Sequence, residues 1–94
     1  KFSPAISFLV HSRTQKEIDY LWDKLSEGGE TEQCGWLKDK YGVSWQIVPM
    51  VLIEMLQVKD VKKSERVMKA MLQMKKIDIA ILKKAYAGSN SRRP

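Results

Sequence analysis

The stretch KDKYGVSWQIVP, residues 38–49, has the pattern of a tight turn followed by a strand. Gly42 suits a turn position with positive φ, and the run 43–48 is rich in the β-branched and aromatic residues that strands favour. Pro49 has no N–H to donate to a sheet, so we expect it to end the strand. Gln46 places a polar amide inside this run, either as a ligand or as part of the packing.

The residues before this stretch predict a strand, a helix and two more strands. The apolar run 4–10 favours a strand buried on both faces, and Thr14 with Glu17 has the spacing of a helix capping box. An apolar stripe and a glycine pair then mark the length of the helix: Ile18, Leu21, Trp22, Leu25 and Gly28-Gly29. Short extended segments are expected at 32–34, 36–39 and 43–48. The predicted order is therefore β-α-β-β-β.

After residue 49 the apolar residues recur at helical spacing. Asp60 or Ser64 is predicted to cap one helix and Asp78 another, which Gly88 ends. We therefore divide the chain into a βαβββ unit at 1–49, a helical extension of the same domain at 50–87 and a disordered tail at 88–94. The sequence starts at Lys1 without a methionine, which is compatible with a piece of a longer protein.

The net charge of +6 is unevenly distributed along the 94 residues. Residues 1–49 hold six Lys or Arg against seven Asp or Glu, whereas residues 50–94 hold eleven against four. We interpret this excess as the solvated outer face of amphipathic helices, because no aromatic residues interleave with the basic ones as in stacking platforms. The alternative is a nucleic-acid-binding adaptor, which would use Lys62, Lys63, Arg66, Lys69, Lys75 and Lys76.

Composition also limits the chemistry that the chain can carry. No stretch approaches the ~20 apolar residues of a membrane span and no signal peptide is visible, so we expect a soluble, cytoplasmic protein. Cys34 is the single cysteine and is predicted to be a buried or half-buried apolar residue, and His11 a surface or capping residue. The methionines are interpreted as core filler rather than a soft-metal site: Met50, Met55, Met68, Met71 and Met74.

Four stretches in this order resemble the C-terminal part of PhnB-like proteins, the 3-demethylubiquinone-9 3-methyltransferase domain family. They are FSPAISFLV, TQKEIDYLWDKLSEGGE, QCGWLKDKYGVSWQIVP and MKAMLQMKKIDIAILKKAY. The resemblance implies membership of the vicinal oxygen chelate, or glyoxalase, superfamily, in which paired βαβββ units build half-barrels. A four-stranded sheet of this size also leaves a face or an edge open, so we expect a homodimer or pairing with a second unit.

The resemblance also implies a position for a metal site. In glyoxalase-type members a His on the first strand and a Glu on the last hold a divalent ion, and these positions correspond here to Ile6, Ser7 or Phe8 and to Gln46. A neutral amide offers one weak oxygen ligand and no charge to compensate the dehydration of a cation. We therefore expect no metal site in this unit, and we interpret Gln46 as a strand residue that hydrogen-bonds within the half-barrel.

The predicted function is the binding of a small molecule in a half-barrel cavity of an α+β fold, with no catalytic residues assigned. Candidate cavity-lining residues are Ser7, Phe8, Trp36, Trp45 and Gln46. The alternative from the resemblance is a metal-dependent lyase, isomerase or dioxygenase that takes ligands from a partner unit. Methyltransferase activity is not expected, because the chain has neither the Gly-rich loop nor the length of a doubly wound nucleotide-binding sheet.

Overall fold

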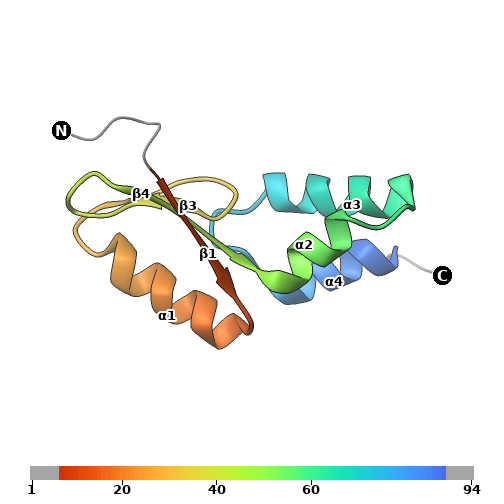
Figure 1. Cartoon of the computed structure of the whole chain (residues 1–94), viewed down its shortest axis with the longest axis horizontal. Helices are drawn as coiled ribbons and strands as arrows, with labels where there is room; N and C mark the ends of the chain where they lie inside the picture. Colours follow the sequence, from red (N-terminus) through yellow and green to blue (C-terminus); the bar gives the residue numbers. More distant parts are fainter. Residues whose placement is uncertain (1–6, 89–94) are drawn as a thin grey trace.

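A mixed four-stranded sheet organises the first half of the chain in the computed structural model, which describes residues 7–88 (Figure 1). The spatial order is β1-β4-β3-β2, with β1 parallel to β4 and the other neighbours antiparallel. The strands are β1 (Ser7–Ser12), β2 (Glu30–Thr31), β3 (Trp36–Lys38) and β4 (Ser44–Pro49). With four helices this is the α+β fold, containing one βαβββ unit, that the sequence predicts.

The strand boundaries differ from the prediction by one residue for β3 and β4 and by more for β1 and β2. β1 runs on to Ser12, and residues 4–6 of the predicted first strand lie outside the described residues. β2 occupies residues 30–31 rather than 32–34. The backbone N–H groups of Cys34 and Gly35 donate instead to the carbonyls of Met74 and Lys75, at 2.8 and 2.7 Å. A contact with the distant α3–α4 loop therefore replaces the predicted strand there.

Helix α1 (Gln15–Ser26) begins as its capping residues predict. The Oγ1 of Thr14 accepts a hydrogen bond from the N–H of Glu17, at 3.2 Å. The Glu17 carboxylate in turn accepts from the N–H of Arg13 at 2.7 Å, one residue earlier than in a standard capping box. Ile18 and Trp22 then pack on the sheet, so the cap fixes where the buried stripe of α1 starts.

Strand register assigns the side chains to the two faces of the sheet. Paired positions in neighbouring strands share a face, and successive residues alternate. Leu37 and Ile47 lie under α1 in a buried cluster with Ile18 and Trp22. The alternate positions of the same strands point to the opposite face, away from α1.

Three helices form the second half of the chain: α2 (Met50–Leu56), α3 (Val61–Leu72) and α4 (Ile79–Ala87). The carboxylates of Asp60 and Asp78 cap α3 and α4, as the sequence predicts, and Pro49 ends β4 directly before α2. These helices enclose a second core, which contains Val48, Leu52, Met55, Val67, Met74, Ile77 and Leu82. Gly88 ends α4, and residues 89–94 of the predicted disordered tail lie outside the described residues.

Side-chain hydrogen bonds join the helical half to the sheet half. Gln15 accepts from the N–H of Ile79 at 2.8 Å and donates to the carbonyl of Ile77 at 3.0 Å. Figure 1 shows α2, α3 and α4 beyond the carboxyl ends of β1 and β4, in a molecule of 51 × 23 × 20 Å. Within residues 7–88, no helix has the length and apolar character required to cross a membrane.

Candidate ligand surface

The face of the sheet opposite α1 is the candidate ligand surface, which we call the open face. Register places Leu9, Gln46 and Trp36 in one row across β1, β4 and β3. Leu9 is 58% exposed, whereas Gln46 and Trp36 are half-buried. An apolar row with one amide at its centre is the composition of many small-molecule sites.

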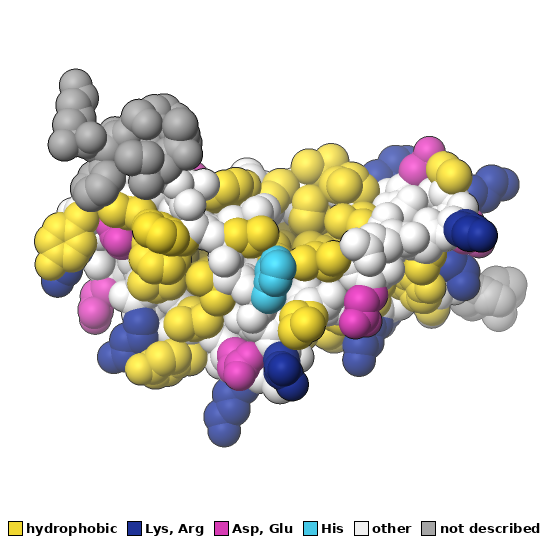
Figure 2. Space-filling view, in the orientation of Figure 1, with side chains coloured by type: hydrophobic (Ala, Val, Ile, Leu, Met, Phe, Trp, Pro, Cys, Tyr) yellow, Lys and Arg dark blue, Asp and Glu magenta, His cyan; other side chains and the backbone are white. Residues whose placement is uncertain are grey.

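β1 forms an edge of the sheet, and no other strand of the described chain covers it. Phe8 and Leu9 on this edge strand are 50% and 58% exposed. Figure 2 shows hydrophobic side chains gathered on the molecular face where β1 lies in front of β4 in Figure 1. A long apolar edge strand of this kind is a site for pairing with another strand.

The structure separates the five predicted cavity residues between the two faces of the sheet. Ser7, Trp36 and Gln46 lie on the open face. Phe8 and Trp45 lie on the α1 side, where their ring centroids are 4.9 Å apart. Their role as cavity lining stays a prediction.

Gln46 uses its amide nitrogen within the protein. Its Nε2 donates to the carbonyl of Cys34 at 3.0 Å, and Cys34 has a left-handed φ of 61°. The amide therefore supports a strained turn between β2 and β3. No hydrogen bond from residues 7–88 reaches the Oε1 atom, which leaves one neutral acceptor on the open face.

Asp39 is a polar centre that was not predicted from the sequence. Its Oδ2 accepts from the indole N–H of Trp45 at 3.0 Å, and its Oδ1 accepts from the N–H groups of Tyr41 and Val43. These donors, the Trp45 indole first, hold the pKa of the Asp39 carboxyl below its ordinary value of 3.8. An Asp that precedes a turn glycine by three residues is the signal that could have identified it.

Metal-ligating side chains do not gather in the described part of the chain. No group of three or more His, Cys, Asp or Glu residues there could hold an ion. His11 is exposed on the open face, and Cys34 is half-buried as predicted. Met55 and Met74 lie in the core, but Met50 and Met68 are 43% and 39% exposed, so their interpretation as core filler was wrong.

Three of the six basic residues that the nucleic-acid-binding alternative would use make contacts within the protein. Arg66 donates to the carbonyls of Ala85 and Tyr86 at 2.8 and 3.0 Å, and Lys63 lies 4.8 Å from the Tyr86 ring centroid. Lys76 forms an ion pair with Asp19 at 3.0 Å, and Gln15 and Lys76 lower the pKa of that carboxyl. The basic face of the helices is therefore partly occupied by structural contacts.

A cleft of about 450 Å³ lies away from the open face, where the β1–α1 turn meets α2 and α4. Its lining contains none of the five predicted residues and is formed by Arg13, Thr14, Gln15, Val51, Asp78, Ile79, Ala80 and Lys83. This cleft was not predicted from the sequence, because its walls come from segments more than 60 residues apart. A smaller hollow of about 140 Å³ lies between the end of α1 and the β3–β4 turn.

Comparison with known families finds a match to the first half of the chain. The family model described as 3-demethylubiquinone-9 3-methyltransferase matches residues 1–48. The match ends at Val48, so it covers β1, α1, β2, β3 and all of β4 except Pro49, but not α2 to α4. A search of curated proteins found no match.

Proposed function

The chain belongs to the 3-demethylubiquinone-9 3-methyltransferase domain family, and from that membership we propose that it binds a small molecule on the open face. The binding cavity is completed by a second βαβββ unit, in the manner of the glyoxalase superfamily. The second unit is another copy of this chain or a separate unit of the same kind.

The exposed apolar edge at β1 is the observation that carries this proposal. Phe8 and Leu9 are at least half exposed on a strand with one free edge, which a single unit cannot cover. Pairing at this edge would place a second sheet beside the first. The row of Leu9, Gln46 and Trp36 would then line the inside of a half-barrel.

Molecular recognition on the open face would combine apolar contact with one hydrogen-bond acceptor. Gln46 offers its Oε1, and Trp36 offers a half-buried ring. Neither group contributes negative charge. The surface therefore favours a neutral ligand with an N–H or O–H group over a ligand whose oxygens are bound to a metal ion.

Sedimentation equilibrium tests the pairing. Leu9→Lys introduces a charge at the edge and is expected to weaken self-association at least tenfold, whereas Leu72→Lys changes a residue of similar exposure, 53%, on α3 and is the control. A wild-type chain that stays monomeric at high concentration, or equal effects of both substitutions, would contradict pairing between copies at β1.

Indole N–H resonances test ligand binding on the same surface. Trp36 lies on the open face, whereas Trp22 of α1 is buried between that helix and the opposite face of the sheet, so a bound ligand is expected to shift the Trp36 signal and not the Trp22 signal. Metal analysis belongs with this experiment: a stoichiometric divalent ion that is lost in Gln46→Ala would favour the metal-dependent enzyme instead.

A further inference from the structure

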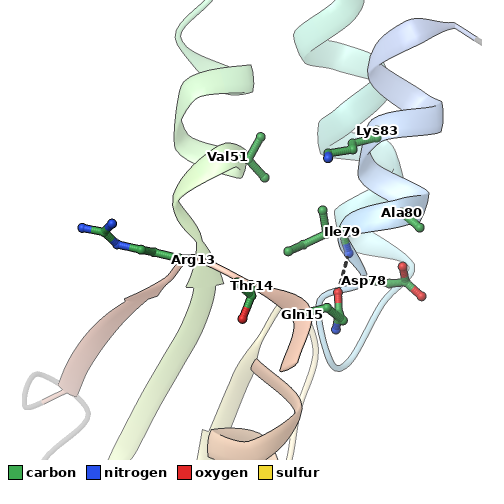
Figure 3. Close-up of a pocket in the computed structure, with 8 residues that line it drawn as sticks. All are labelled: Arg13, Thr14, Gln15, Val51, Asp78, Ile79, Ala80 and Lys83. Atoms are coloured by element: carbon green, nitrogen blue, oxygen red, sulfur yellow. Dashed lines mark hydrogen bonds between the residues drawn. The ribbon is translucent and has the colours of Figure 1, made fainter. Parts of the chain in front are cut away.

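Hydrogen bonds link two of the elements that line the cleft between the two halves of the molecule. Gln15 in the β1–α1 turn holds the start of α4 through its hydrogen bonds to Ile77 and Ile79 (Figure 3). Thr14 caps α1 and Asp78 caps α4. These bonds hold the β1–α1 turn against the start of α4, so this side of the cleft is linked without a ligand.

Two N–H groups at the start of α4, at the base of the cleft, already have partners. The N–H of Ile79 donates to Gln15, and the N–H of Ile81 donates to the Asp78 carboxylate at 3.2 Å. The start of α4 therefore has few free donors for a multiply charged anion such as phosphate, which needs several N–H groups. The base of the cleft does not resemble a phosphate site.

The open part of the cleft combines apolar walls with one cation. Figure 3 shows Val51 of α2 facing α4, while Ile79 and Lys83 extend from α4 toward α2. The Arg13 side chain extends away from α4, and the Asp78 carboxylate also points away from Val51. Among the described residues, Lys83 has no ion-pair partner, since the ion pair present there joins Lys76 and Asp19.

We propose that this cleft binds a small monocarboxylate with an apolar body. The carboxylate would pair with the Lys83 ammonium, and the apolar body would lie between Val51 and Ile79. A volume of about 450 Å³ is in the range of small-molecule sites, and the net charge of +6 attracts anions to the surface. The site is separate from the open face and does not depend on pairing at β1.

Chemical-shift titration with hexanoate at pH 7 tests the proposal in the full chain. Saturable shifts are expected at the amides of Val51, Ile79 and Lys83, at concentrations up to about 10 mM, which saturates even a millimolar Kd. Hexanol and hexylammonium have the same apolar chain with no charge or the opposite charge. Equal binding of either compound, or no saturable shift with hexanoate, would overturn the proposal.

Two lysines on α4 provide the matched pair of variants. Lys83→Gln is expected to weaken hexanoate binding about fivefold, the upper range for an exposed ion pair. Lys84→Gln removes the same charge from a residue that does not line the cleft and should leave the affinity unchanged. Equal weakening by both variants would show a general charge effect and overturn the site.

Val51→Phe is a second, steric test. The larger side chain is expected to fill the space facing Ile79 and abolish the hexanoate shifts while α2 remains folded. Unchanged binding in a folded Val51→Phe chain would place the ligand elsewhere and contradict the proposal. If this variant does not fold, the two lysine variants still decide the question.

Discussion

The sheet half and the helical half of the molecule bury their apolar residues in different ways. The helical half surrounds its own core, which α2, α3 and α4 enclose together with Val48. The sheet half buries one face under α1, whereas its other face is only half-buried at Trp36 and Gln46 and its β1 edge is exposed. The difference indicates that the sheet half is where a partner or ligand would add the most buried surface.

The largest expected effect comes from cavities in the two cores. Ile47→Ala in the sheet half and Leu82→Ala in the helical half each truncate a fully buried side chain, and each should lower the free energy of unfolding by about 2–5 kcal/mol. Urea denaturation, monitored by tryptophan fluorescence and by the circular dichroism of the helices, measures the loss in each variant. Since hydrogen bonds link the halves, the two signals should change together, and separate transitions would show that the halves unfold independently.

Gly35 lies at the contact between the two halves, where its N–H donates to the carbonyl of Lys75. Its φ is 81°, and an added Cβ would lie 2.8 Å from the carbonyl oxygen of Ile47. Gly35→Ala should therefore lower the free energy of unfolding more than Gly42→Ala does. At Gly42 the φ is 84°, but no atom lies within 4 Å of an added Cβ. Only the cost of about 1–2 kcal/mol for the left-handed conformation applies there. Thermal melts of both variants measure the loss of stability. Equal losses in the two variants would show that the β2–β3 turn relaxes to accommodate the added Cβ.

Gln15 links the two halves through its side chain. Gln15→Ala leaves the N–H of Ile79 and the carbonyl of Ile77 without these partners, which should cost about 1–2 kcal/mol of stability. Gln73→Ala, at an exposed residue after α3, is the control. Equal stability of the two variants in urea would mean that water replaces the Gln15 hydrogen bonds at no cost.

The smallest expected effect is the pH dependence that Asp39 confers on the sheet half. The folded pKa is below the ordinary 3.8, so the carboxylate stabilises the fold at higher pH, and this contribution is lost as the pH falls through the folded pKa. Trp45→Phe removes the first donor and should raise the pKa of Asp39 toward 3.8, as measured by NMR titration of its carboxyl carbon. An unchanged pKa would assign the shift to the backbone donors alone.

The elements with local signals were predictable from the sequence. Thr14, Asp60 and Asp78 cap helices because their side chains reach N–H groups three residues away, a distance that local geometry sets. The turn glycine Gly42 and the strand end at Pro49 follow from backbone sterics in the same way. The order β-α-β-β-β and the half-buried Cys34 were therefore correct.

Features that depend on distant partners were not predictable. The turn at 33–35 replaced a strand because Met74 and Lys75 accept its N–H groups, and Gln15 reaches α4 across more than 60 residues. The exposure of Met50 and Met68 likewise depends on how their helices pack. A propensity pattern contains no information about such contacts.

Sequence alone determined the fold class, the βαβββ order and the neutral amide of Gln46 where the family resemblance implies a carboxylate ligand. These follow from residue type and short spacing, which chain stereochemistry converts directly into local structure. Only the tertiary structure decided that Phe8 and Trp45 lie on the α1 side of the sheet, that Leu9 joins Gln46 and Trp36 on the open face, and that a cleft forms beside Lys83. Strand register and helix docking set those positions, and both result from the simultaneous packing of the whole chain.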